Sequence, residues 1–172
     1  MPAKDQGVFE DSYKLIPRVL VFATHEDSIL LLKGSSRKRL WANLYNGIGG
    51  HIDKGEDILS AALREFYEET ALQLENSWLC AIITIDTNED IGIGMYVFRG
   101  GVPSKEFKSS SEGFLEWIPI ENIQSLPLVE DLPILVPRIM TMNKTDPPLI
   151  LHYFYDKNED LIIRSEDEIL EI

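Results

Sequence analysis

The chain has 172 residues, a length that fits one domain with a sizeable hydrophobic core. Hydrophobic residues make up 44% and charged residues 26%, and no apolar run approaches the roughly 20 residues of a membrane-spanning helix. Sixteen basic and 29 acidic residues give a net charge of −13, and no long basic patch is visible, which argues against nucleic acid as a partner. We therefore expect a single domain over residues 1–172, monomeric or homodimeric, that binds neither a membrane nor a nucleic acid polymer.

Residues 1–11 contain no apolar signal-peptide core. The single cysteine, Cys80, cannot form a disulfide within the chain, and it lies in the apolar run 79–83. A free cysteine in such surroundings is more often a buried filler than a nucleophile. These features predict a cytoplasmic protein with an unreactive cysteine.

The first predicted elements are two β-strands, because the apolar segments 14–23 and 28–33 flank a polar turn over residues 24–27. The basic loop that follows, residues 33–39, is the densest positive cluster in the chain. It either improves solubility or contacts phosphate at the mouth of a site. In the second case Lys33 is a candidate substrate contact.

Residues 41–47 carry candidate base-binding side chains. Trp41 and Tyr45 either stack on a base or pack the loop, and the sequence favours neither. Asn46 offers one acceptor and two donors, which is enough to read the edge of a base.

A glycine-rich turn over residues 47–50 precedes a predicted helix. Gly49 and Gly50 have no Cβ, so the backbone there is able to approach a ligand closely. From Ile58 onward the segment is rich in helix formers and has no Gly or Pro, which predicts a helix of roughly four turns. The acidic residues just before Ile58 suit the positive end of the helix dipole.

Three glutamates lie on one face of this helix. Glu65, Glu68 and Glu69 are spaced i, i+3, i+4, and Arg64 is able to pair with Glu68. A divalent cation such as Mg²⁺ or Mn²⁺, which prefers oxygen ligands, would relieve the repulsion between the glutamates. The alternative is a solvated acidic face. A different stripe of the helix is predicted to pack on the core, namely Leu59, Leu63, Phe66 and Thr70.

The rest of the chain mixes predicted strands and helices. Strands are expected over residues 78–86, 91–99 and 114–119, a polar loop over 102–111, a helix start over 120–123, a helix over 132–142 with a kink or break at Pro137, a hairpin of 149–155 with 161–164, and an acidic surface tail over 165–172. This order fits an α/β/α sandwich with a mixed sheet.

The glycine turn and the helix together resemble the Nudix box of the Nudix hydrolase family. Gly50 is followed after five residues by Glu56, and after seven more by the motif REFYEE at residues 64–69. Within the box, residues 50–72, only Ala71 departs, where the family usually has Gly; we expect this small residue to cost little. The resemblance covers nearly the whole chain and implies the Nudix fold, an α/β/α sandwich with a mixed β-sheet.

The resemblance also implies a metal site and a role for each box residue. Mg²⁺ or Mn²⁺ would supply the local positive charge that a phosphate substrate needs in so acidic a protein. The backbone at Gly49 and Gly50 would lie beside the phosphates, and Glu56 would support the site through water or through Arg64. The implied metal ligands are Glu65, Glu68 and Glu69, with Glu68, Glu69 and Arg64 among the catalytic residues.

A further carboxylate from outside the helix often completes such sites. Glu112, five residues before Trp117, matches the position used in the oxidised-purine triphosphatases, and we expect it to join the metal ligands and catalytic residues. Glu116 is the competitor, but its place beside Trp117 in a strand predicts that it faces solvent.

Beyond the box, the chain is similar to the MutT-type 8-oxo-dGTP diphosphatase subgroup. The sequence YNGIGG at residues 45–50 resembles that subgroup's Trp-Asn-Gly-Phe-Gly-Gly turn, and Glu130 and Asp131 resemble its acidic pair. In the subgroup the asparagine and the acidic pair hydrogen-bond the purine, and two adjacent carboxylates are able to share a proton. The alternative is that Glu130 and Asp131 merely open a helix.

The resemblance therefore implies metal-dependent hydrolysis of a nucleoside triphosphate, such as the oxidised purine 8-oxo-dGTP, to the monophosphate and pyrophosphate. An alternative is a pyrophosphatase for ADP-ribose or another nucleotide sugar. A nucleotide-binding module without catalysis is less favoured, because the box keeps its full set of glutamates.

Overall fold

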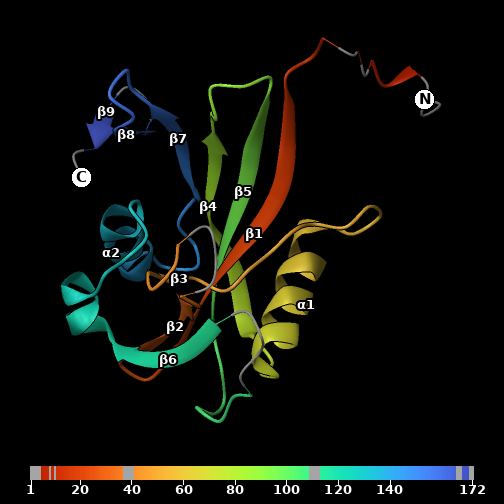
Figure 1. The fold of residues 1–172 in the computed structure, drawn as a ribbon. Coiled ribbons are helices and arrows are strands. Elements are labelled where there is room, and N and C mark those ends of the chain that lie inside the picture. Colours follow the sequence, from red (N-terminus) through yellow and green to blue (C-terminus); the bar gives the residue numbers. More distant parts are fainter. Residues whose placement is uncertain are drawn as a thin grey trace.

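The computed structural model describes residues 5–7, 9, 11–36, 41–108, 113–165 and 168–170. A mixed β-sheet lies between two helices (Figure 1). The elements are β1 (Lys14–His25), β2 (Ser28–Gly34), β3 (Tyr45–Asn46), α1 (Ile58–Thr70), β4 (Glu75–Ile85), β5 (Ile91–Gly101), β6 (Gly113–Pro119), the 3₁₀ helix η2 (Ile120–Ser125), α2 (Leu132–Thr141), β7 (Leu149–Tyr155), β8 (Leu161–Ser165) and β9 (Glu168–Leu170).

The sheet combines parallel and antiparallel pairs, as predicted. Its strand order is β3-β2-β1-β5-β4-β7-β8-β9, and β6 pairs with β2. β1 runs parallel to β5 and antiparallel to β2, while β4 runs antiparallel to β5 and parallel to β7. Because β1 is a central strand paired along its length with β5, its residues are held in a fixed register beneath the glycine turn.

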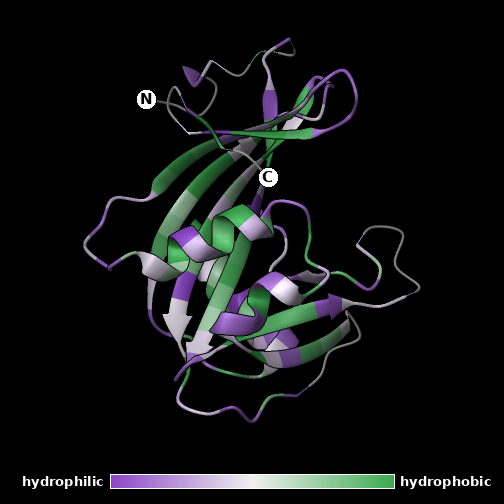
Figure 2. Ribbon diagram, turned by 90° about the vertical axis from the view of Figure 1, so that its left-hand side faces the viewer, coloured by the Kyte–Doolittle hydropathy of each residue, from purple (hydrophilic) through white to green (hydrophobic). Residues whose placement is uncertain are grey.

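Hydrophobic cores lie on both faces of the sheet. Successive residues of a strand point to opposite faces, so Leu20 and Phe22 of β1 join the core under α2, while Val19 and Val21 join the core under α1. This double burial explains why β1 is a continuous apolar run, and Figure 2 shows the central strands as predominantly hydrophobic. The α/β/α sandwich predicted from the sequence is confirmed.

Helix α1 buries only half of the stripe expected, because Phe66 and Thr70 are fully buried as predicted but the two leucines are not. Leu59 is 41% exposed and Leu63 is 37% exposed, so the prediction that they pack on the core is wrong. Small side chains take their place and let the helix lie close to the sheet, and Glu69 lies on this same inner side with only 8% exposure. The buried residues of the helix are Ala61, Ala62, Phe66, Glu69 and Thr70.

Most of the other elements agree with the sequence. The predicted hairpin is present as β7 and β8, with Leu151 paired to Ser165, whereas the short strands β3 and β9 were not expected. Cys80 is buried, and its burial raises the pKa of the thiol to about 12, in keeping with an unreactive filler. Within the described ranges, no helix is long and apolar enough to cross a membrane.

Candidate active site

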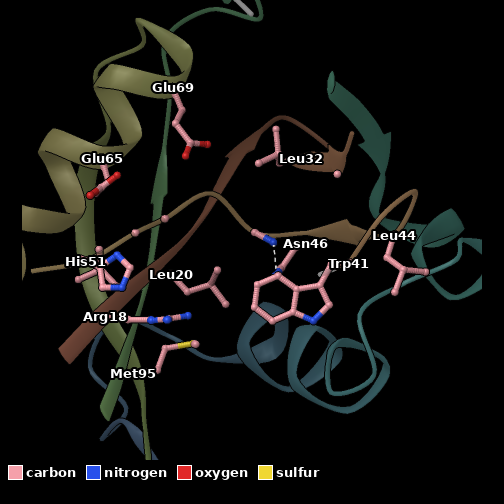
Figure 3. A pocket seen from close by; sticks show the side chains of 15 residues that line it. Arg18, Leu20, Leu32, Trp41, Leu44, Asn46, His51, Glu65, Glu69 and Met95 are labelled. Carbon is pink, nitrogen blue, oxygen red and sulfur yellow. Dashed lines mark hydrogen bonds between the residues drawn. The ribbon is translucent and has the colours of Figure 1, made fainter. Parts of the chain in front are cut away.

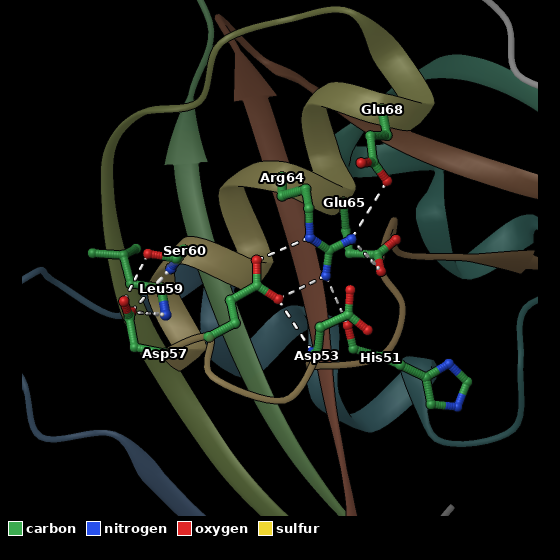
Figure 4. Close-up of polar contacts among 9 residues, drawn as sticks. His51, Asp53, Asp57, Leu59, Ser60, Arg64, Glu65 and Glu68 are labelled. Carbon is green, nitrogen blue, oxygen red and sulfur yellow. Dashed lines mark hydrogen bonds and ion pairs between the residues drawn. The ribbon is translucent and has the colours of Figure 1, made fainter.

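Helix α1 begins at Ile58 because Asp57 caps its first turn (Figure 4). The Asp57 Oδ1 accepts hydrogen bonds from the backbone N–H groups of Leu59, at 2.9 Å, and Ser60, at 3.0 Å. Glu56, one residue earlier, makes no such cap. Its carboxylate points instead toward the side chain of Arg64.

Arg64 joins Glu56 to the glycine turn. Its Nε and Nη2 donate to the two carboxylate oxygens of Glu56 at 2.9 and 2.8 Å, and Nη2 also donates to the His51 carbonyl at 3.0 Å. This paired hydrogen bond lowers the pKa of Glu56 and raises the pKa of Arg64. Glu56 therefore contacts Arg64, as one of the two expected routes requires, and its supporting role stays a prediction.

The same arginine contacts two of the predicted metal ligands. Arg64 Nη1 donates to Glu65 Oε1 at 2.9 Å and to Glu68 Oε2 at 3.4 Å. The Glu68 side chain is 58% exposed, so the expected pairing of Arg64 with Glu68 is present but long and solvated. Arg64 thus holds Glu65 firmly and the more exposed Glu68 only loosely.

The glycines allow the turn to pack against both β1 and the helix. Val21 N–H donates to the Ile48 carbonyl at 2.7 Å, and Val19 N–H donates to the Gly50 carbonyl at 3.0 Å. A Cβ at Gly49 would clash with the Val19 carbonyl, and a Cβ at Gly50 would clash with the Glu65 carboxylate. The turn therefore needs glycine for contacts with the protein, and the same bare backbone lines a cavity.

That cavity has a volume of about 410 Å³ and contains Glu65 and Glu69 on one side (Figure 3). Asn46 and Trp41 lie on the opposite side of the space, and Arg18 lies between the two sides. The remaining lining residues are Val19, Leu20, Leu32, Gly34, Leu44, Gly47, Gly49, Gly50, His51 and Met95.

A second cavity of about 200 Å³ adjoins the first and contains the predicted acidic pair, Glu130 and Asp131. Tyr153 and Tyr155 also line it. The two cavities share five lining residues, so together they form one continuous groove from the helix glutamates to the acidic pair. The shared residues are Leu20, Trp41, Leu44, Asn46 and Met95.

Backbone pairing with β3 brings the acidic pair to Asn46. Tyr45 N–H donates to the Pro127 carbonyl at 2.8 Å, and Val129 N–H donates to the Tyr45 carbonyl at 3.0 Å. Glu130 and Asp131 follow directly. The Asn46 Oδ1 accepts from Gly47 N–H at 2.7 Å, so the amide nitrogen is the end of this side chain that remains to donate.

Burial raises the pKa of Asp131 to about 6, and the neighbouring charge of Glu130 adds to the shift. Burial also raises the pKa of Tyr153, and the nearby charge of Asp131 adds to that shift. An aspartic acid with this pKa exists in both protonation states near neutral pH. It is able to donate a hydrogen bond in one state and accept one in the other.

Two residues predicted to contact substrate lie outside the groove. Tyr45 is buried, and its hydroxyl donates to Glu116 at 2.6 Å, a hydrogen bond that raises the pKa of Tyr45 to about 12. Lys33 Nζ lies 5.1 Å from the centre of the Tyr45 ring. Of the two alternatives for Tyr45, packing the loop describes its position. Glu116 is exposed, as expected, although it also serves as the acceptor for Tyr45.

Part of the predicted site cannot be placed. Glu112 and the basic-loop residues Arg37, Lys38 and Arg39 lie outside the described residues, so their roles stay predictions. Within the described ranges, no three His, Cys, Asp or Glu side chains are gathered closely enough to hold a metal. Glu65 and Glu69 nevertheless face one cavity, and their carboxylate oxygens are the donors that a hard divalent cation prefers. These two carboxylates therefore supply part of a ligand set for a divalent cation.

Several groove residues were missed by the sequence analysis, above all Arg18 and Met95, which face each other across the β1–β5 pair. Met95 carries no signal in the sequence. Arg18 does, because it is a charged residue inside the apolar run 14–23 that predicts a buried strand.

The sequence pattern of the NUDIX domain matches residues 14–139. The chain belongs to the NUDIX domain family. Nudix hydrolases generally use divalent metal ions and act on small nucleotide substrates. The matched range includes both the glycine turn and helix α1, which carry the predicted box residues.

The chain is also similar, at low sequence identity, to individual Nudix proteins. The chain is 28% identical over 108 residues to the uncharacterized Nudix hydrolase YvcI of Bacillus subtilis, a match that covers 60% of this chain and 65%, just under two thirds, of that relative. It is 26% identical over 152 residues to the oxidized purine nucleoside triphosphate hydrolase of Danio rerio, covering 87% of this chain and 93% of that protein.

The fold is shared with solved Nudix structures. The crystal structure of a MutT protein from Bacillus halodurans superposes with a TM-score of 0.74, covering 90% of this chain and 99% of that chain at 23% identity. At this identity the likeness supports the fold and leaves the substrate to be argued from the groove.

Proposed function

We propose that this Nudix protein hydrolyses an oxidised purine nucleoside triphosphate, such as 8-oxo-dGTP, to the nucleoside monophosphate and pyrophosphate. The proposal rests on one observation above all: the box glutamates and the candidate base-reading side chains lie along the same groove. The similarity to the Danio rerio enzyme over most of both chains supports the same substrate class.

At one end of the groove, Glu65 and Glu69, with Glu68, would hold a divalent cation. That cation would screen the charge of the phosphates, activate water and stabilise the leaving pyrophosphate. Arg64 orients Glu65 through its 2.9 Å hydrogen bond, and Glu56 in turn fixes Arg64. If Glu112 also faces this end of the groove, it would complete the carboxylate set.

At the other end, the Asn46 amide nitrogen would donate to the purine, and the carboxyls of Asp131 and Glu130 would contact the opposite part of its edge. Oxidation at C8 of a purine adds a carbonyl oxygen and converts N7 from an acceptor into an N–H donor. A carboxyl with a pKa of about 6 suits such a base, because it is able to accept from the new donor or to donate to a carbonyl. Trp41, which lines both cavities and is partly exposed, is positioned for stacking on the ring.

A substrate panel tests this function. We would measure pyrophosphate or phosphate release from 8-oxo-dGTP, dGTP, the other dNTPs, ADP-ribose and further ADP-sugars, each with Mg²⁺ and with Mn²⁺. We expect kcat/KM for 8-oxo-dGTP to exceed that for dGTP by about tenfold or more, since one well-placed polar contact is worth about 1–3 kcal/mol. A higher kcat/KM for ADP-ribose would refute the proposed substrate and favour the nucleotide-sugar alternative.

A further inference from the structure

The groove contains a basic side chain that belongs to none of the predicted motifs. Arg18 projects from β1, and Figure 3 shows its guanidinium between Leu20 and Met95. In the part of the chain that the structure describes, Arg18 makes no ion pair, and its Nε is buried without a hydrogen-bond partner.

Arg99 and Arg64, by contrast, are satisfied within the fold. Arg99 donates to the carbonyls of Ile139 and Met140, at 2.9 and 3.0 Å, at the end of α2, and Arg64 is bound by Glu56. A guanidinium N–H that is removed from water and has no acceptor is costly, and folded proteins rarely keep one without a compensating contact. The unsatisfied donor of Arg18 therefore points to an acceptor supplied by a ligand.

The position of Arg18 limits what that acceptor is. It lines the cavity that contains Glu65 and Glu69, but it does not line the smaller cavity that contains Asp131. A nucleotide with its base at Asp131 and its reacting phosphates at the glutamates would place its sugar and first phosphate in between. Among the described residues that line the larger cavity, Arg18 and the exposed His51 are the only basic ones.

We propose that Arg18 binds the α-phosphate, the phosphate that stays on the nucleoside after cleavage; this role rests on the proposed nucleotide hydrolysis. A guanidinium presents paired N–H donors that match two phosphate oxygens. Its positive charge offsets the carboxylates that would otherwise repel an anion from this groove. Because the contact is to phosphate, its contribution does not depend on the base, and it persists in the monophosphate product.

The test is the binding of product rather than turnover. We would measure, by calorimetry in EDTA, the Kd of 8-oxo-dGMP and of 8-oxo-deoxyguanosine for the wild type, Arg18→Gln, Arg18→Lys and the control Arg164→Gln. Arg164 is exposed on β8 and lines neither cavity, so its substitution makes the same change in net charge away from the groove.

We expect Arg18→Gln to weaken 8-oxo-dGMP binding about 10- to 100-fold and to change the Kd of the nucleoside by less than about twofold, as for loss of one charged hydrogen-bonding pair. Arg18→Lys keeps the charge but loses the paired donors, so its loss should be intermediate, and it serves as the folded variant if Arg18→Gln does not fold. Arg164→Gln should match the wild type for both ligands.

An unchanged Kd for 8-oxo-dGMP in the Arg18 variants, or equal losses for nucleotide and nucleoside, would overturn the assignment. The two proposals fail separately. A wild type that hydrolyses no nucleotide but shows Arg18-dependent binding of the monophosphate refutes the proposed function alone. An active wild type whose monophosphate binding is independent of Arg18 refutes the phosphate contact alone.

Discussion

Replacing Asp131 with Asn should make the protein more stable at pH 7.5 while weakening its binding of the oxidised purine. The Asp131 carboxyl lies beside Tyr153 in the smaller cavity, and burial raises its pKa from 3.8 to about 6. At pH 7.5 the folded protein must therefore ionise a carboxyl in surroundings that disfavour the charge. Asparagine has nearly the same shape and is neutral at every pH.

The magnitude follows from the difference in pKa between the folded and unfolded states. A shift of about 2 units, at 1.36 kcal/mol per unit, corresponds to about 3 kcal/mol. Because the folded pKa is raised, the stabilising contribution of the protonated carboxyl is fully present below about pH 4 and is lost as the pH rises through 6. The Asn variant should therefore gain up to about 3 kcal/mol in free energy of unfolding at pH 7.5, and roughly half of that at pH 5.

Thermal and urea unfolding at pH 5 and pH 7.5 would measure this gain. For a chain of this length, about 3 kcal/mol corresponds to a rise in Tm of about 6–12 °C at pH 7.5. Asp131 makes no side-chain cap on α2, so the substitution removes no capping hydrogen bond. Glu130→Gln is the matched control: the same charge is removed from an exposed neighbour, and the free energy of unfolding should change by less than about 0.5 kcal/mol.

The same variant connects stability to function. If Asp131 reads the base, Asp131→Asn should raise the KM for 8-oxo-dGTP about tenfold, whereas a substrate bound mainly through phosphate should lose little. An Asn variant that is no more stable than the wild type at pH 7.5 would refute the argument that burial destabilises the Asp131 carboxylate. Equal losses for all nucleotides would point to a structural role in place of base reading.

Three further substitutions test the box. Glu69→Gln should leave the fold intact and lower kcat at saturating Mg²⁺ by about 100-fold or more, because a misplaced metal costs several kcal/mol of transition-state stabilisation; near wild-type turnover would remove Glu69 from the ligand set. Ala71 has φ 58° and ψ 18°, a left-handed conformation that suits glycine, so Ala71→Gly should raise the free energy of unfolding by about 1 kcal/mol in urea titrations, and a loss of stability would contradict this. Gly50→Ala should displace the Glu65 carboxylate and lower activity far more than the control Gly101→Ala, whose new Cβ would meet nothing closer than 3.8 Å; equal activities would show that the turn tolerates a side chain.

The sequence predicted the local parts of this structure well. The start of α1 depends on Asp57 and on helix propensity, both of which act within a few residues, and the strands follow from apolar runs bounded by turns. The expectation that Ala71 costs little was made from the size of its side chain, whereas the position is determined by the backbone, which is left-handed there. The left-handed backbone at Ala71 was known only from the structure.

The two ends of the groove could not be joined from the sequence by physical reasoning alone. Asn46 and Asp131 are brought together by the pairing of Tyr45 with Pro127 and Val129, a contact between segments about 80 residues apart. Strand β3 has only two residues, which is too short for an alternating apolar and polar pattern. The sequence therefore does not predict this pairing. Only the resemblance to the MutT-type subgroup suggested that Asn46 and Asp131 lie at one site. The structure shows the backbone hydrogen bonds of Tyr45 with Pro127 and Val129 that bring the two segments together.

Helix α1 departs from the usual pattern in which apolar side chains are buried and charged side chains are exposed. By hydrophobicity alone, Leu59 and Leu63 should face the sheet and Glu69 should face water, yet the helix is rotated so that the leucines are exposed and Glu69 is nearly buried. Arg18 breaks the same rule on the strand beneath, where a charged side chain enters a groove lined by Leu20 and Met95. Sequence-to-structure conflicts of this kind are concentrated at functional sites, because a fold keeps such costs only where a ligand offsets them. The inward Glu69 and the unsatisfied Arg18 would thus serve the same bound nucleotide: Glu69 would bind the metal cation at its phosphates, and Arg18 would bind its anionic α-phosphate.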